Sequence, residues 1–372
     1  MAREILSGAR LFDGTRFIDG HALVIEDGEI TAILPADKAP AEGRREIAGI
    51  IAPGFLDLQV NGGGGLMVDG TTDLAALRHI CAAHRGLGTA AILPTLITDT
   101  PEATASVIAA GIAAAGAGVP GFLGLHLEGP HLDPRRKGAH DSALIRPMTG
   151  EDLARLCDAA RRLPALMVTL APEAATPEQI ATLSGAGAIV SLGHSDCDYD
   201  TARAAFEAGA SCATHLFNAM SQLGHRTPGL VGAILSGHAR AGLIADGIHV
   251  HPAAMRTTLA ARTEGIFLVT DCMAFAGTDL TEMELNGRQV LRRDGRLTLA
   301  DGTLAGADLI LPDAIALLVT ELGITPGRAL RMATAEPAQL LGIEDHHGRL
   351  TPGRKADLIR LGPDFQVIEH WL

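Results

Sequence analysis

Three side chains that can bind a metal ion each stand at the end of an apolar run. Glu128 ends the run in LHLEGPHL, His194 the run in SLGHSD, and His215 the run in ATHLFNAM. A single histidine in such a place more often has a structural role. One carboxylate and two imidazoles from three separate runs, however, are the His₂Glu set of catalytic zinc sites, which leaves coordination open for water and substrate. We therefore predict a divalent metal ion at Glu128, His194 and His215.

A fourth chemical group, Asp271, ends the run in LVTDCMAF. Aspartate is also favoured as a helix N-cap, which would be a purely structural role. A zinc ion, however, lowers the pKa of its bound water from ~15.7 to about 7. An ionised carboxylate nearby can then accept a proton from that water and pass it to a leaving amine. We predict that Asp271 is the catalytic acid–base.

Other polar segments allow both a structural and a functional interpretation. His249 ends the run in ADGIHVHP, and Lys137 to His140 form the polar segment KGAH. His225 and Arg226 follow the His215 run, where the guanidinium could either bind a phosphate bidentately or be solvated. The glycines 62–65 lack the Lys-Ser/Thr ending of a P-loop and the GxGxxG spacing, so we predict a turn there.

The segments that must position these residues repeat one sequence pattern. Each short apolar run ends in a polar residue and is followed by an Ala/Leu-rich helical pattern, which predicts parallel strands with right-handed crossovers. There are eight such runs, which predicts an α/β fold of the (β/α)₈ TIM-like barrel class with its chemistry at the carboxyl ends of the strands. An open doubly wound sheet would instead gather its ligand contacts at one switch point. The runs are IIAPGFLDLQV, TAAILPTLIT, FLGLHLEG, LMVTLAPE, AIVSLGHSD, SCATHLFN, RAGLIADGIHV and GIFLVTDCM.

The two ends of the chain differ from the barrel pattern. Residues 1–49 and 346–372 show short strand patterns, with Asp-Gly hairpin signals near the beginning. Neither end can bury one face alone, so we predict that they combine into a small β-sandwich-like domain beside a barrel formed by residues 50–345. Residues 284–306 have the pattern of hairpins inserted late in the barrel.

Composition narrows the possible partners and compartment. With 30 basic and 43 acidic residues the net charge is −13, and there is no basic stripe with interleaved aromatic residues, so nucleic acid is not an expected partner. The five cysteines are an odd number without a CxxC pair, which is typical of reduced thiols. We see neither a signal-peptide pattern nor a membrane-spanning stretch. We therefore expect a cytoplasmic protein without membrane contact, acting on a small molecule.

The ordered set of motifs resembles the amidohydrolase superfamily and, within it, the family of N-acetylglucosamine-6-phosphate deacetylases. The resemblance covers essentially the whole chain. It implies hydrolysis of the acetamide of N-acetyl-D-glucosamine 6-phosphate to D-glucosamine 6-phosphate and acetate by a homodimer. The motifs are PGFLDLQVNGGGG, HLEGPHL, KGAH, GHSDC, THLFNAM, RTPGLVGAIL, ADGIHV, VTDCMAFAG and GRLTPGRKADL.

The resemblance also implies roles for single residues. Its metal ligands fall on Glu128, His194 and His215, its catalytic aspartate on Asp271, and the histidine that helps to polarise the acetamide carbonyl on His140. In this family the arginine that matches Arg226 can come from the other subunit of a homodimer. The implied substrate-binding residues are Gln59, Ala139, His140, Asn218, Ala219, Arg226, Asp246, His249, Leu304, Ala305 and Gly306.

The first barrel strand carries a departure from the superfamily pattern. Many amidohydrolases place His-x-His there to bind a second metal, whereas this chain has Gln59 and Asn61. Amide oxygens are poorer zinc ligands than imidazole, so we expect one divalent ion per subunit, with zinc first and Fe²⁺ or Co²⁺ as alternatives. Three other functions remain open: deacetylation of N-acetylgalactosamine 6-phosphate, hydrolysis of a cyclic amide, and binding of a sugar phosphate without catalysis.

Overall fold

An eight-stranded parallel barrel forms the centre of the computed structural model, which describes residues 3–285 and 287–372. Its neighbouring strands all pair in parallel, in the order β17-β16-β15-β14-β13-β12-β11-β8. The predicted (β/α)₈ barrel is therefore confirmed. The barrel strands are β8 Phe55–Val60, β11 Thr89–Ile97, β12 Leu125–Glu128, β13 Leu166–Leu170, β14 Ile189–Leu192, β15 Cys212–Ala213, β16 Arg240–Leu243 and β17 Ile266–Leu268.

The first and last barrel strands meet beyond the end of β17. Val60 and Cys272 form a parallel bridge, and the Asn61 N–H donates to the Cys272 carbonyl at 2.9 Å. The Asp271 N–H donates to the Gln59 carbonyl at 3.0 Å. These bonds bring the amides of Gln59 and Asn61 beside Asp271, which is more than 200 residues away in sequence.

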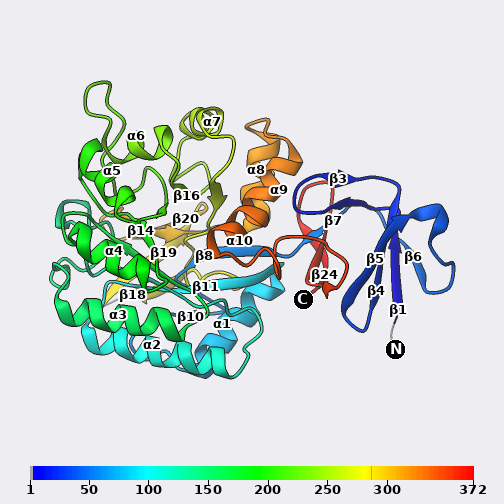
Figure 1. Cartoon of the computed structure of the whole chain (residues 1–372), viewed down its shortest axis with the longest axis horizontal. Helices are drawn as coiled ribbons and strands as arrows, with labels where there is room; N and C mark the ends of the chain where they lie inside the picture. The colour runs from blue at the N-terminus through cyan, green and yellow to red at the C-terminus, as the bar shows by residue number, and fades with distance from the viewer. Residues whose placement is uncertain (1–2, 286) are drawn as a thin grey trace.

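Helices connect the barrel strands and lie around them (Figure 1). Several begin with a side-chain cap, and two have a full capping box, Thr149 with Asp152 and Thr176 with Gln179, which satisfies the free N–H groups of the first turn. The helices are α1 Leu74–Gly86, α2 Pro101–Gly116, α3 Gly150–Arg162, α4 Pro177–Gly185, α5 Tyr199–Glu207, α6 Gly229–Ser236, α7 Pro252–Ala261, α8 Leu311–Thr320, α9 Pro326–Ala333 and α10 Ala335–Leu341.

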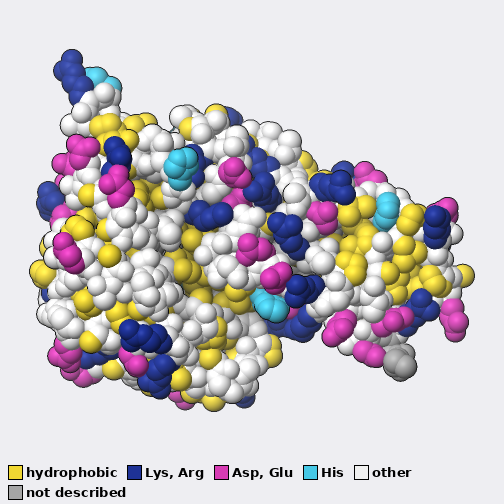
Figure 2. Space-filling view, in the orientation of Figure 1, with side chains coloured by type: hydrophobic (Ala, Val, Ile, Leu, Met, Phe, Trp, Pro, Cys, Tyr) yellow, Lys and Arg dark blue, Asp and Glu magenta, His cyan; other side chains and the backbone are white. Residues whose placement is uncertain are grey.

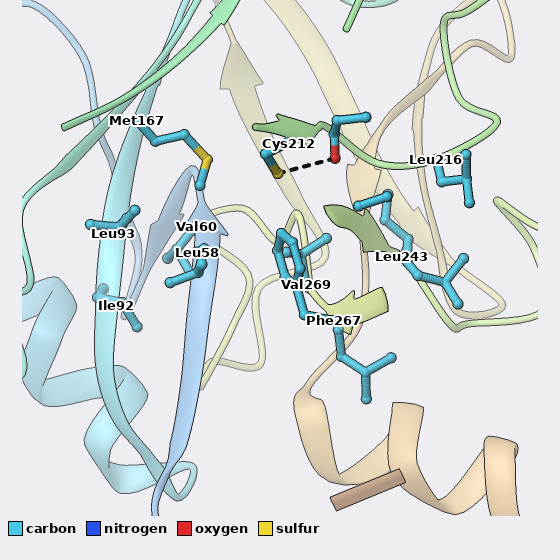
Figure 3. Close-up of a cluster of buried hydrophobic side chains, with 14 of the residues drawn as sticks. Leu58, Val60, Ile92, Leu93, Met167, Cys212, Leu216, Leu243, Phe267 and Val269 are labelled. Carbon is cyan, nitrogen blue, oxygen red and sulfur yellow. Dashed lines mark hydrogen bonds between the residues drawn. The ribbon is translucent and has the colours of Figure 1, made fainter. Parts of the chain in front are cut away.

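Aliphatic side chains build the core of the barrel because aromatic residues make up only 3% of the chain. Figure 3 shows part of this core, where Leu58 and Val60 of β8 lie near Ile92 and Leu93 of β11. Side chains alternate between the two faces of a strand. Gln59, which stands between Leu58 and Val60, therefore belongs to the other face and reaches the polar site.

Strands from both ends of the chain form two further five-stranded sheets, which lie beside the barrel at the right of Figure 1. One has the order β22-β5-β4-β1-β6 and the other β24-β23-β7-β2-β3. The strand β7 pairs with β2 and β23, so residues 50–53 lie in a terminal sheet. The limits of the two domains given above remain predictions. The strands are β1 Arg3–Ser7, β2 Arg10–Phe12, β3 Phe17–Ile18, β4 His21–Glu26, β5 Glu29–Pro35, β6 Arg44–Glu46, β7 Ile50–Pro53, β22 Arg354–Lys355, β23 Leu358–Leu361 and β24 Val367–Trp371.

The inserted hairpins form a sheet of their own. Four antiparallel strands follow one another as β18 Glu282–Leu285, β19 Arg288–Arg293, β20 Arg296–Leu299 and β21 Leu304–Ala307. A parallel bridge between Cys272 and Ala307 ties this sheet to the segment after Asp271. The insert therefore reaches the carboxyl end of the barrel.

The glycines 62–65 form a tight hairpin between β9, Gly62–Gly63, and β10, Leu66–Met67. Gly64 and Gly65 have φ of 61° and 88°, which L side chains rarely adopt. A Cβ on Gly63 would also lie 2.6 Å from the ring of His84. The predicted turn is confirmed, and the glycines are needed for backbone geometry and close packing.

Acidic and basic side chains are mixed over the face shown in Figure 2. Across residues 3–285 and 287–372, no helix has the length and apolar character that a bilayer crossing requires.

Candidate active site

The three predicted metal ligands converge inside the carboxyl end of the barrel. Glu128 closes β12, and His194 and His215 follow β14 and β15. The Oε1 atom of Glu128 lies 3.2 Å from His194 Nε2 and 3.0 Å from His215 Nε2, and the two Nε2 atoms are 3.1 Å apart. All three side chains are buried. One carboxylate oxygen and two imidazole nitrogens facing one point could hold a divalent cation.

The proton positions on His194 fit this role. Its Nδ1 lies 2.8 Å from the carbonyl oxygen of Arg136, which can only accept a hydrogen bond, so Nδ1 carries the proton. In the neutral ring Nε2 then keeps its lone pair toward Glu128 and His215. Such a carbonyl partner typically fixes the tautomer of a metal-binding histidine.

Electrostatics keeps the carboxylate of Glu128 ionised. Burial by itself would raise its pKa, but the neighbouring His194 and His215 side chains hold the pKa of Glu128 well below its usual value. Gln59 adds a hydrogen-bond donor, because its Nε2 lies 3.3 Å from both carboxylate oxygens. A buried carboxylate that stays ionised can bind a cation.

Backbone conformation aims the site residues into the barrel. His194, His215 and Asp271 have φ of 47°, 27° and 52°, in the left-handed region that residues with a Cβ seldom adopt. Each such residue costs on the order of 1–3 kcal/mol. The chain leaves the strand conformation at these three residues, and all three side chains line the same cavity.

Asp271 lies beside the metal triad. Its Oδ1 accepts hydrogen bonds from Asn61 Nδ2 at 2.7 Å and from Gln59 Nε2 at 3.2 Å. Burial, and then the negative charge of Glu128, raises the pKa of Asp271 to about 6. One amide, Gln59, thus bridges the two carboxylates where a second metal would otherwise be expected.

His140 presents a hydrogen-bond donor to the same space. Its Nδ1 accepts from the Thr98 backbone N–H at 3.3 Å and lies 2.7 Å from the Thr98 hydroxyl. Nδ1 is therefore the acceptor and Nε2 carries the proton. Burial, and then the neighbouring His194, lowers the pKa of His140 to about 3, so the ring is neutral. A neutral Nε2–H can donate to a carbonyl oxygen that gains negative charge.

A cavity of about 250 Å³ joins these groups. Most of the predicted substrate-binding residues line it, together with Glu128, His194, His215 and Asp271. The predicted substrate-binding residues in its wall are Ala139, His140, Asn218, Ala219, His249, Leu304, Ala305 and Gly306.

Three predicted substrate-binding residues lie outside the wall of the cavity. Gln59 lies behind it, bonded to Glu128 and Asp271. Asp246 accepts from His249 Nδ1 at 2.6 Å and so orients that ring instead of facing the cavity. Arg226 is exposed on the projecting loop between β15 and α6 (Figure 1). Within one chain, Arg226 therefore does not reach the cavity.

The cavity wall also contains residues that the sequence did not single out as site residues. Asn61 is 5% exposed, and its Oδ1 has no partner within the described part of the chain. Met67, Met273 and Leu285 add an apolar side to the wall. Only Asn61 had a signal in the sequence, its place two residues after Gln59; apolar residues in a wall look the same as apolar residues in a core.

Asp57 is a further residue that the sequence did not single out, and it lies outside the cavity wall. It is fully buried in β8 and accepts from the Thr270 hydroxyl at 2.5 Å and from the Thr270 N–H at 3.2 Å. Burial raises its pKa to about 7. The bonds to Thr270 fix the backbone next to Asp271, so Asp57 helps to hold Asp271 in its position.

A parallel barrel with a carboxylate, two histidines and an aspartate at its carboxyl end defines the class of metal-dependent hydrolases. The chain belongs to the amidohydrolase family, whose family model matches residues 50–370. This confirms the family resemblance drawn from the motifs.

Two relatives and one solved structure show which amidohydrolases this chain is similar to. The chain is 39% identical to the N-acetylgalactosamine-6-phosphate deacetylase of Shewanella sp. (strain ANA-3) over 99% of this chain and 94% of that protein. It is 35% identical to the human N-acetylglucosamine-6-phosphate deacetylase over 98% of this chain and 91% of that protein. The crystal structure of N-acetylglucosamine-6-phosphate deacetylase from Pasteurella multocida is 34% identical, with a TM-score of 0.94 over 99% of this chain and 98% of that one.

Proposed function

We propose that this chain hydrolyses the acetamide of N-acetyl-D-glucosamine 6-phosphate to D-glucosamine 6-phosphate and acetate. The observation that carries the proposal is the meeting of the metal triad, Asp271 and His140 around one cavity of about 250 Å³. Hydrolysis of an amide needs an activated water, a proton carrier and a donor for the oxyanion, and these residues can provide all three. Binding without catalysis would require none of them.

One divalent ion per chain, zinc first, is the proposed cofactor. When bound at Glu128, His194 and His215 it would acidify a water and polarise the acetamide carbonyl. Gln59 and Asn61 occupy the positions at which a second metal would need imidazoles, and both already donate to Asp271. Iron(II) and cobalt(II) remain alternatives because they accept the same ligands.

The chain's own residues would then divide the chemistry. Asp271 takes the proton of the attacking water on its carboxylate and returns it to the leaving amine. The Nε2–H of His140 donates to the carbonyl oxygen as negative charge develops there. His249, oriented by Asp246, and residues 304–306 of the insert would hold the sugar over the reacting groups.

Among residues 3–285 and 287–372, no lysine or arginine lines the cavity, so the phosphate of the substrate would require a positive charge from elsewhere. Asn218 and Ala219 line the cavity, but Arg226 is exposed on its loop. We infer that the chain forms a homodimer in which Arg226 of each subunit reaches the site of the other. The neighbouring Leu223, which is 54% exposed, would be covered by the same contact.

Mixing two inactive variants tests this arrangement. Arg226→Gln lacks the phosphate contact and Asp271→Asn lacks the base, so each homodimer should be inactive. A mixed dimer has one complete site, formed by Asp271 of one subunit and Arg226 of the other. After unfolding and refolding together in equal amounts, the mixture should recover about a quarter of wild-type kcat. Recovery below about 2% in an assembled dimer would show that Arg226 serves its own subunit.

A second candidate substrate is N-acetylgalactosamine 6-phosphate. One observation supports this candidate. The Shewanella relative, which is 39% identical over 99% of this chain, is named as a deacetylase of this epimer. The two sugars differ only in the orientation of one hydroxyl, which His249 or residues 304–306 could sense.

Acetate release from both epimers, measured side by side, tests the function and the choice of substrate. We expect kcat/KM for N-acetylglucosamine 6-phosphate to be about five- to thirtyfold higher than for the galactose epimer, since one misplaced hydrogen bond to a hydroxyl costs about 1–2 kcal/mol. Unphosphorylated N-acetylglucosamine is the control and should react far more slowly. A reversed ratio would assign the galactose epimer, and no acetate from either sugar would refute the proposed function.

A further inference from the structure

Four arginine side chains gather at the end of the barrel opposite the metal triad. Arg240 begins β16, Arg262 follows α7, and Arg328 and Arg331 belong to α9. They surround Glu336 of α10, whose side chain is only 3% exposed. In a chain with a net charge of −13, this concentration of positive charge is unusual and calls for a reason.

Two of the arginines have carboxylate partners. Arg240 Nη1 lies 2.6 Å and Arg331 Nη2 2.9 Å from the two oxygens of Glu336. Arg331 also lies 3.4 Å from Glu264, which is 73% exposed. Glu336 is therefore shared by Arg240 and Arg331, and Glu264 pairs with Arg331.

The other two arginines contact backbone carbonyls instead. Arg262 Nη1 donates to the Ile234 carbonyl at 2.5 Å, and Arg328 Nη2 donates to the carbonyls of Leu259 and Arg262, both at 2.6 Å. No carboxylate among residues 3–285 and 287–372 forms an ion pair with Arg262 or Arg328. These bonds hold each guanidinium group in place through one nitrogen, Nη1 of Arg262 and Nη2 of Arg328.

Glu336 attracts both of these guanidinium groups and Glu264 attracts Arg262, but neither group has a carboxylate of its own. Burial, and after it the charge of Arg240, lowers the pKa of Arg262. Burial, and after it the charge of Arg331, lowers the pKa of Arg328. A bound anion would offset the repulsion from Arg240 and Arg331.

Space for an anion lies directly beside these groups. Two cavities of about 260 Å³ and 450 Å³ share the side chains of Arg262, Thr263, Glu264 and Glu336 in their walls. Arg328 and Arg331 line the first cavity and Arg240 the second. We call this site the arginine pocket; its members are Arg240, Arg262, Thr263, Glu264, Arg328, Arg331 and Glu336.

We propose that the arginine pocket binds a phosphate group, either free phosphate or the phosphate of a small monoester, at the end of the barrel away from catalysis. Four guanidinium groups against two carboxylates leave an excess of two positive charges, which matches a phosphate dianion. The planar forks of Arg262 and Arg328 suit its oxygens because guanidinium binds phosphate bidentately. This inference does not depend on the function proposed above.

Thermal unfolding with inorganic phosphate tests the site. Phosphate at ten times its dissociation constant should raise the Tm of the wild-type protein by about 2 °C. Thr263→Glu places a carboxylate among the guanidinium groups without removing any arginine, so this variant should lose that rise. Thr257→Glu, which adds the same charge on the exposed side of α7, is the matched control and should behave as wild type.

A second set of measurements distinguishes this site from the active site and shows whether free phosphate or a phosphate monoester binds. The inhibition of deacetylation by phosphate should be the same in all three proteins, since it reports on the metal end of the barrel. Glucose 6-phosphate in place of inorganic phosphate shows whether a monoester fits. A full Tm rise in Thr263→Glu, or no rise in wild type with either probe, overturns the proposal. Thr263→Asp repeats the test with a shorter side chain should the first variant not fold.

Discussion

Replacing Asp271 by asparagine should lower kcat by about 10³-fold while the metal ion and the substrate still bind. The amide has the shape of the carboxylate, and its oxygen can still accept from Asn61 Nδ2, which lies 2.7 Å from Asp271 Oδ1. It cannot take the proton of a water. The loss should therefore appear in kcat, with KM nearly unchanged.

The measurement combines steady-state acetate release with metal analysis on the same sample. Asp279→Asn is the control, because Asp279 is exposed in the same segment and lies outside the cavity wall. Its kcat and metal content should equal those of wild type. A kcat of Asp271→Asn within tenfold of wild type would remove Asp271 from the proton transfer.

The barrel could be predicted because each strand leaves a local trace. An apolar run buried on both sides ends where the chain reaches the active-site end, and a polar residue there stands out. Glu128, His194, His215 and Asp271 all have this signal. The resemblance of the motifs then supplied residues such as Ala139, which no local pattern marks, and the cavity wall contains it.

Other features depend on contacts between distant segments and leave no local trace. The apolar run 50–60 divides between β7 in a terminal sheet and β8 in the barrel, because Gly54 separates two strands that pair with different partners. The bridge of Gln59 between Glu128 and Asp271 joins three segments of the chain. The place of Arg226 outside the cavity depends on the fold of its loop.

The apolar side of the cavity was beyond prediction for a different reason. Met273 and Leu285 pack with Phe275 and Val290 in a small cluster of the insert, and they face the cavity only because the insert lies over the barrel mouth. Arg288 ties the two parts together by donating to the Ala139 carbonyl at 2.6 Å. A hairpin pattern predicts strands, but not the surface on which they lie.

Replacing Glu128 by glutamine should remove the metal ion and with it nearly all activity. The side chain is 2% exposed and is the only negative charge among the three ligands, so the change leaves two neutral imidazoles and an amide. Removing a residue that hydrogen-bonds to a metal ligand typically lowers the affinity for the metal about 10–100-fold. Loss of a direct charged ligand should cost at least about 100-fold. Metal analysis after dialysis should give one ion per wild-type chain and almost none in the variant.

The control for this variant is Glu173→Gln. Glu173 also follows a barrel strand, β13, but it accepts from the Ser195 hydroxyl at 2.8 Å and lies outside the cavity wall. That variant should keep its metal. Adding zinc should raise the Tm of wild type and of Asp271→Asn, because an ion that binds only the folded state stabilises it, but should leave Glu128→Gln unchanged. Full metal occupancy in Glu128→Gln would exclude this triad as the metal site, whereas an occupied and inactive Asp271→Asn would separate metal binding from proton transfer.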